Sequence, residues 1–218
     1  MRAIAIGLAV SILACTPAFA GLVYDNGTPD LKNGFDMTAF READDFTLAS
    51  ASTIAGISFW SVPANGNFAG SFDGSVTWAV YNDAAGSPGT LVSSATVNSV
   101  PFTATGTDVQ GNSNFPVFQL DVTLAAPLAL SAGTYWLELH EGASLTANDG
   151  SPVFWVTSGN GVLKGSSSES ALLSALPSSS NASDLAFQLF DASVPEPGSW
   201  VLVAGGLLTL LGVSRLRR

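Results

Sequence analysis

The amino-acid sequence predicts an all-β fold: an antiparallel, jelly-roll-like β-sandwich between a cleaved signal peptide and a single short C-terminal transmembrane helix. No long stretch of residues 21–193 shows a helical period. Short alternating segments are instead separated by glycine, proline, asparagine and serine, which is typical of strands and turns. Each end of the chain carries an apolar run. These observations divide the chain into residues 1–20, an extracytoplasmic domain over 21–193, and a tail over 194–218.

The first twenty residues match a secretory signal peptide. Arg2 precedes an apolar run over residues 3–15, and Ala18-Phe19-Ala20 supplies the small-residue site that signal peptidase cuts. We expect cleavage between Ala20 and Gly21. The alternative is a lipoprotein signal in which Cys15 is lipidated. Because Cys15 is the single cysteine of the chain, cleavage leaves a domain without disulfides or thiolate metal ligands.

Nine strands are expected in the domain, each a short run bounded by turn residues. They cover residues 44–50, 53–61, 75–82, 90–97, 100–106, 116–124, 133–140, 152–157 and 184–190. The run from Asn82 to Gly89 predicts a loop between two of them, and the serine-rich stretch 165–183 predicts another. Their spacing favours a sandwich of antiparallel sheets.

The domain is strongly acidic. Residues 21–193 hold sixteen of the seventeen acids but only three of the seven basic residues, a net charge of −13. Such a surface repels nucleic-acid phosphates and suits a solvated extracellular protein. Nucleic acid is therefore not expected as a partner.

The tail ends in an apolar run over residues 200–213, followed by Arg215, Arg217 and Arg218. At ~1.5 Å per residue this run spans ~21 Å, short of the ~30 Å of a bilayer core. The arginines place its end on the cytoplasmic side of the inner membrane. The short, glycine-containing helix favours transient membrane residence, and an ordinary tail anchor is the alternative.

The order of these features resembles the PEP-CTERM sorting signal of Gram-negative bacteria. The resemblance rests on Val194, Pro195, Glu196 and Pro197, the short apolar helix, and the closing arginines Arg215, Arg217 and Arg218. It implies recognition by an exosortase-type membrane enzyme, removal of the tail near Pro-Glu-Pro, and delivery to the cell surface or the exopolysaccharide of a biofilm. Segments such as Trp78–Asp83 also resemble ectodomains found beside this tail, for which no activity is implied.

Catalytic motifs are lacking in the sequence. His140 is the single histidine, so any histidine-dependent triad would depend on it, and a His-Glu-x-x-His zinc site cannot form. No Gly-x-Ser-x-Gly elbow and no phosphate-binding glycine loop occurs. A glycoside hydrolase that uses a pair of carboxylates is still possible, although nothing in the sequence identifies which two acids would form the pair.

Tryptophans suggest a glycan-binding platform. In strand 133–140, Trp136, Glu138 and His140 share one face by their period of two, and Trp60 and Trp155 have the parity opposite to their apolar neighbours. On an exposed face these rings would stack on sugars while the polar side chains bind hydroxyls. The alternative is that both faces of the sheet are covered and the tryptophans belong to the core.

Acidic residues suggest a calcium site. Asp44 and Asp45 open one expected strand and Asp184 opens another, so they converge if the first and last strands pair. Carboxylate oxygens suit calcium. The alternative is that they discourage edge-to-edge pairing of strands. Taken together, the sequence favours a non-enzymatic structural or adhesive module, with a carbohydrate-binding module and a secreted glycoside hydrolase as the alternatives.

Overall fold

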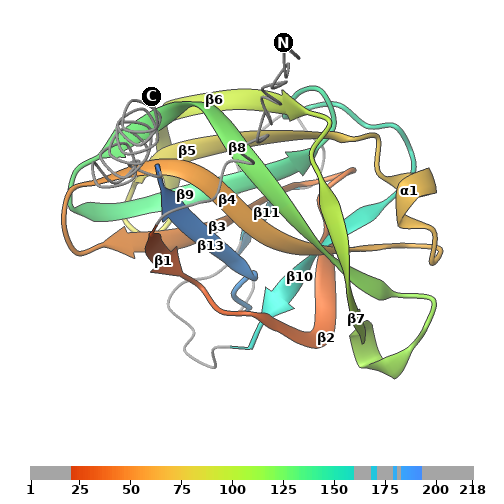
Figure 1. The fold of residues 1–218 in the computed structure, drawn as a ribbon. Helices are drawn as coiled ribbons and strands as arrows, with labels where there is room; N and C mark the ends of the chain where they lie inside the picture. Colours follow the sequence, from red (N-terminus) through yellow and green to blue (C-terminus); the bar gives the residue numbers. More distant parts are fainter. Residues whose placement is uncertain (1–20, 160–167, 171–178, 181–182, 193–218) are drawn as a thin grey trace, which may run out of the picture.

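The computed structural model describes residues 21–159, 168–170, 179–180 and 183–192. Within these residues the chain is all-β, and its antiparallel strands form two sheets packed into a β-sandwich (Figure 1). The signal peptide expected over 1–20 and the tail expected over 194–218 lie outside the described residues. In the described part, no helix has the length and apolar character needed to cross a bilayer.

The first sheet is organised around one long strand that is buried on both faces. It contains β1 (Leu22–Asp25), β13 (Phe187–Asp191), β4 (Ser52–Pro63), β10 (Val153–Ser158), β2 (Pro29–Asp36), β8 (Pro116–Leu130) and β7 (Phe102–Asp108). β4 pairs with β13 and β10 along one side and with β8 along the other, and β7 extends the sheet beyond β8. Because β4 is covered on both faces, its sequence is a nearly continuous apolar run.

The second sheet packs against the first. Its strands, in spatial order, are β12 (Ser179–Ser180), β11 (Ser168–Ser170), β3 (Arg41–Leu48), β9 (Gly133–Glu141), β5 (Ser75–Asp83) and β6 (Pro88–Asn98). Two short helical turns, α1 (Phe68–Ser71) and η1 (Val109–Gly111), lie in the connections. Asn67 caps α1 by accepting a hydrogen bond from the Gly70 backbone N–H at 3.1 Å.

The main core lies between the two sheets. Phe46, Leu137 and Leu139 from the second sheet meet Phe59 and Phe187 from the first, and all five are at most 1% exposed. The period of two along β9 sends these leucines inward, on the face opposite to Trp136, Glu138 and His140. The intervening residues of β9 therefore face the outside of the second sheet.

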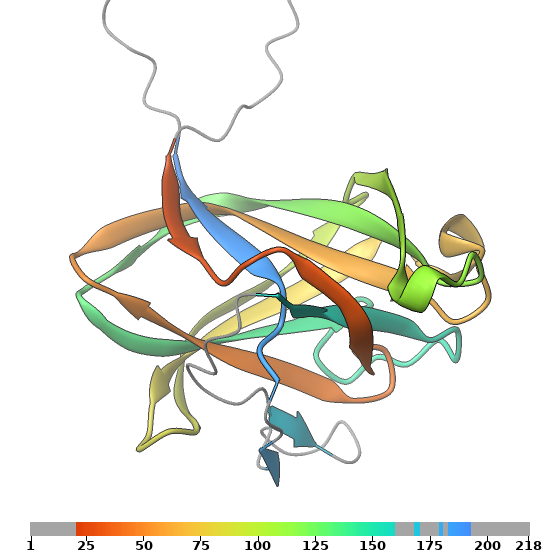
Figure 2. The ribbon, with the colours of Figure 1, turned by 90° about the horizontal axis from the view of Figure 1, so that it is seen from below.

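The strand pairings are nested along the chain. β1 pairs with β13, β3 with β9, β4 with β8 and β5 with β6. The two ends of the described domain consequently lie side by side, at the start of β1 and the end of β13 (Figure 2). The Asp191 backbone N–H donates a hydrogen bond to the Gly21 carbonyl at 3.0 Å, so the segments before and after the domain attach at one pole.

All nine expected strands are present, with shifted ends. The expected loop is the tight turn Ala84–Ser87, in which Ala85 and Gly86 have positive φ and the Ala84 N–H donates to the Ser87 carbonyl at 2.8 Å. The stretch 165–183, expected as a loop, contributes β11 and β12 in its described parts.

Sequence reasoning missed β1 and β2. β1 has only four residues, and β2 contains proline, two aspartates, asparagine and glycine, a composition that is typical of a loop. β2 forms because it pairs with β10, where Gly34 lies against Phe154 and Trp155. A Cβ at Gly34 would stand 3.0 Å from the Phe154 Cβ, so glycine permits this close approach.

Candidate functional site

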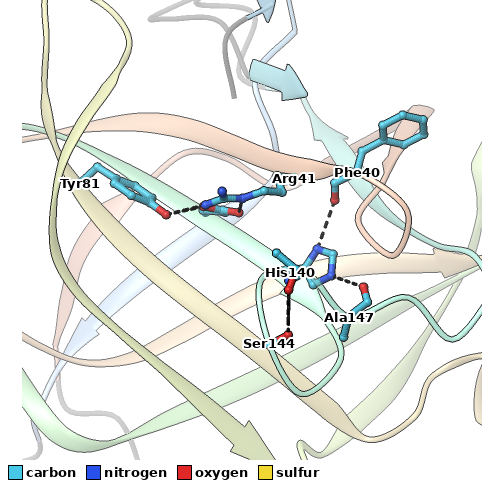
Figure 3. A network of polar contacts seen from close by, with 8 residues as sticks. Phe40, Arg41, Tyr81, His140, Ser144 and Ala147 are labelled. Atoms are coloured by element: carbon cyan, nitrogen blue, oxygen red, sulfur yellow. Dashed lines mark hydrogen bonds and ion pairs between the residues drawn. The ribbon is translucent and has the colours of Figure 1, made fainter. Parts of the chain in front are cut away.

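The outer face of the second sheet gathers most of the polar side chains that the sequence singled out. Trp136, Glu138 and His140 share this face of β9. Neighbouring strands add Arg41 and Tyr81, which Figure 3 shows near His140. The face is buried: Trp136 is 1% exposed, and Glu138 and His140 are 0% exposed. Leu145, from the segment after β9, packs against the Trp136 cluster.

At the centre of this face, Arg41, Glu138 and Tyr81 form a closed hydrogen-bonded triad. Arg41 donates to the two Glu138 carboxylate oxygens, from Nε at 2.6 Å and from Nη2 at 2.7 Å. Arg41 Nη2 also contacts the Tyr81 hydroxyl at 2.8 Å, and that hydroxyl donates to Glu138 Oε2 at 2.6 Å. The paired geometry of guanidinium and carboxylate is the strong, orienting form of this interaction.

The electrostatics of the triad follow from its burial. The hydrogen bond that Arg41 donates to Glu138 raises the pKa of the Arg41 guanidinium, against the opposing effect of burial. Burial, followed by the charge of Glu138, raises the pKa of the Tyr81 hydroxyl. Arg41 and Tyr81 therefore keep their protons, and their hydrogen bonds with Glu138 tie β3, β5 and β9 together.

His140 joins two segments through its ring nitrogens. Nδ1 lies 3.2 Å from the Phe40 carbonyl oxygen, and Nε2 lies 2.7 Å from the Ala147 carbonyl oxygen. Carbonyls only accept hydrogen bonds, so a ring nitrogen that carries a proton donates to the carbonyl beside it. This arrangement holds the segment after β9 against the start of β3 and engages both nitrogens that a catalytic histidine would need.

Glu141 is a buried acid that sequence reasoning overlooked. It is the last residue of β9 and is 1% exposed. Its Oε1 accepts a hydrogen bond from the Asp73 backbone N–H at 2.9 Å. Burial raises its pKa to about 7, the Asp73 N–H opposes that shift, and the charges of Asp149 and Asp73 add to it. The alternation of the strand could have predicted this burial, because Glu141 has the same parity as the inward-facing Tyr135, Leu137 and Leu139.

The platform of tryptophans is not formed, and that prediction is corrected. Trp60, Trp136 and Trp155 are 7%, 1% and 0% exposed, and they belong to three different apolar clusters. Trp155 lies in the main core and donates from Nε1 to the Ala186 carbonyl at 2.9 Å, while Trp136 donates from Nε1 to Asp83 at 3.0 Å. Both faces of β9 are covered, so these rings, Glu138 and His140 offer no exposed surface on which a sugar could stack.

The three aspartates of the expected calcium site lie near one another but are engaged by the protein itself. Asp44 is 0% exposed; its Oδ2 accepts from Asn26 Nδ2 at 2.8 Å and from the Leu185 N–H at 2.6 Å, and its Oδ1 accepts from the Asp45 N–H. Burial, partly offset by the Leu185 N–H, raises the pKa of Asp44 well above its usual value, and the charges of Asp184 and Asp45 add to the rise. Asp44 thus ties β3 to the segments flanking β1 and β13.

Metal binding finds no support in this geometry. Across the described residues, no three acidic, histidine or cysteine side chains are placed to hold a metal ion. The donors around Asp44 are N–H groups, which occupy the oxygens that a calcium ion would need. Asp44 and Asp184 are buried and Asp45 is half-buried beside them, and the oxygens of Asp44 serve the fold.

Two surface hollows lie elsewhere. One of about 590 Å³ is lined by Val23, residues 51–53, Ala129, Leu130, Asp191 and Ala192, at the pole where the domain begins and ends. One of about 220 Å³ lies between β2, η1 and β10, with Phe115, Phe154 and Lys32 in its wall. None of the residues singled out from the sequence lines either hollow.

The remaining site residues belong to the termini. Gly21, the expected first residue of the mature chain, is described and adjoins Asp191. Ala18 and Ala20 of the expected cleavage site, and Val194, Pro195, Glu196, Pro197, Arg215, Arg217 and Arg218 of the sorting motif, lie outside the described residues.

Comparison with known proteins adds no relative. No protein-family model matches the sequence, and no curated protein matches it.

Proposed function

We propose that this protein is an exported cell-surface or exopolysaccharide-associated protein, whose non-enzymatic β-sandwich acts as a structural or adhesive module and whose C-terminal tail directs its sorting. The observation that carries the proposal is the succession of three features in the tail sequence. Val194-Pro195-Glu196-Pro197 comes first, a short apolar run follows, and an arginine cluster closes the chain. An exosortase-type enzyme is its processing partner. The signal peptide over residues 1–20 supplies the route across the inner membrane.

The arrangement of the domain's ends suits this role. The Gly21–Asp191 hydrogen bond brings both ends to one pole (Figure 2), so a tail inserted in the membrane holds the sandwich from that pole alone. The remainder of the sandwich then faces outward without the chain crossing its surface. Release of the tail would leave the paired strands β1 and β13 intact, because their pairing ends at Phe190 and Leu22.

The structural role of the domain is supported by how its polar groups are used. Arg41, Glu138 and Tyr81 bind one another, and Asp44 binds backbone and amide N–H groups, so these groups hold strands together. We infer further that the sandwich is jelly-roll-like, because β1-β13-β4-β8 and β3-β9-β5-β6 are neighbours in the two sheets and their pairings nest along the chain.

Mass spectrometry of the protein isolated from its native cells tests the sorting proposal. The wild-type chain is expected to begin at Gly21 and to end close to the Pro-Glu-Pro motif. The variant Glu196→Ala/Pro197→Ala is expected to keep Arg218 and to stay in the membrane fraction. Leu202→Val, a conservative change in the apolar run, serves as the matched control and is expected to be processed normally. A wild-type chain still ending at Arg218 would contradict the proposal.

A further inference from the structure

Two successive strands carry almost no charge, although the domain as a whole is strongly acidic. Residues 84–107 contain no aspartate, glutamate, lysine or arginine, whereas the domain has a net charge of −13. This run includes all of β6 and all of β7 except its last residue, Asp108. We refer to these two strands as the neutral edge.

Both strands of the neutral edge are terminal in their sheets. In the described part of the chain, β6 pairs only with β5 and β7 pairs only with β8. A terminal strand presents backbone N–H and C=O groups along its free side, and natural proteins usually blunt such edges with charges, prolines or bulges. Register shifts disturb β6 only before Ser93, so Ser93–Asn98 runs in unbroken register with β5 and contains neither a charge nor a proline.

Large apolar side chains are exposed at both ends of the neutral edge. Four large hydrophobic side chains are exposed among the described residues, and three of them are on β6 and β7: Leu91 at 49%, Val92 at 38% and Phe102 at 40%. Phe102 packs against Phe68, Phe72 and Phe118 of its own chain. Leu91 and Val92, which directly precede the unbroken part of β6, are therefore the apolar side chains that a partner along β6 would cover.

We propose that a second copy of this chain binds at the neutral edge, with β6 of one copy pairing antiparallel to β6 of the other about a two-fold axis. Two copies share the same acidic surface, so an approach through other parts of the domain brings like charges together, while an approach through β6 does not. A two-fold pairing joins both free β6 edges at once and closes the assembly as a dimer. The inference concerns the domain alone and goes beyond the sorting of the protein.

The test measures the mass of the full-length chain in a nonionic detergent by light scattering and sedimentation. Ser94 is exposed on β6, and Ser94→Lys places a charge in the middle of the unbroken edge. Ser50→Lys makes the same substitution at an exposed residue between β3 and β4 and is the matched control. We expect wild type and Ser50→Lys to dimerise and Ser94→Lys to dimerise at least about tenfold more weakly.

A cross-linking experiment identifies the partner strand. With Cys15 replaced by Ala, the Ala95→Cys variant is expected to form a covalent dimer, because residues near the middle of an antiparallel pair lie opposite their own copies. The Ser50→Cys variant is the control and is expected to cross-link no faster than random collision allows. A monomeric wild type, a dimer that Ser94→Lys leaves unchanged, or equal cross-linking of the Ala95→Cys and Ser50→Cys variants would each overturn the proposal. None of these outcomes bears on whether the tail is cleaved.

Discussion

The buried triad on the second sheet makes a quantitative prediction about stability. Replacing Arg41 by Met removes both hydrogen bonds from the guanidinium to Glu138, which is 0% exposed and keeps the Tyr81 hydroxyl as a donor. Removing one partner of a buried ion pair typically costs about 3–5 kcal/mol, because the remaining charge stays buried without compensation. We expect Arg41→Met to lower the free energy of unfolding by an amount in that range.

The double variant Arg41→Met/Glu138→Met separates the cost of a stranded charge from the worth of the pair. Replacing a whole buried pair by apolar side chains is often neutral or stabilising, so the double variant is expected to lie within about 1–2 kcal/mol of wild type. That residual cost reflects the Tyr81 hydroxyl, which loses both partners. The two substitutions are therefore expected to be strongly non-additive.

The assay is urea unfolding of the full-length chain in detergent, followed by tryptophan fluorescence, to which Trp136 on the same face contributes. Lys32→Met is the matched control, because Lys32 is 76% exposed and lies 3.9 Å from Asp30. Its effect is expected to stay within about 0.5 kcal/mol. A loss below about 1 kcal/mol for Arg41→Met, or a double variant whose cost equals the sum of the two single costs, would refute the reasoning.

Two further predictions concern buried groups. The pKa of Glu141 is raised to about 7 in the folded state from an ordinary value of 4.5, so the folded state binds more protons between these values and stability falls as pH rises through that window. Glu141→Gln is expected to remove this part of the decline, worth up to about 3 kcal/mol above pH 7, in unfolding curves measured from pH 4 to 8; superimposable profiles for the two proteins would contradict the assignment. Trp136→Ala is expected to destabilise the fold by about 3–5 kcal/mol through lost packing and the lost hydrogen bond to Asp83. If its stability in urea matches wild type while retention on exopolysaccharide falls, Trp136 is a ligand-binding residue after all.

The strands were predictable wherever local pattern and local environment agree. β9 alternates cleanly, with Leu137 and Leu139 inward, and the turn Ala84–Ser87 contains the glycine that its positive φ requires. β2 was missed because its pairing with β10 outweighs its loop-like composition, and Gly34 is the residue that permits this contact. Register with a strand more than a hundred residues away is not encoded in a local pattern.

The candidate site was predictable in part. Parity placed Trp136, Glu138 and His140 correctly on one face of β9, but it did not reveal that this face is covered. The partners of Glu138 come from β3 and β5, so Arg41 and Tyr81 could not be assigned to it from spacing alone. The proximity of the three aspartates was expected only if the strands over 44–50 and 184–190 pair, but β3 and β13 lie in different sheets. Asp44 instead meets the segment before β13 through the Leu185 N–H, across the two sheets.

By itself, the sequence determined the all-β class, nine of the strand segments and the acidic character of the domain, because these depend on local periodicity and composition. It also supplies every argument for the sorting tail, which stays a proposal. Only the tertiary structure decided that the tryptophans are core, that Arg41 compensates Glu138, and that the neutral run over residues 84–107 forms the edge strands. Burial and charge compensation depend on which distant segments come into contact, and the local pattern of a sequence does not specify those contacts.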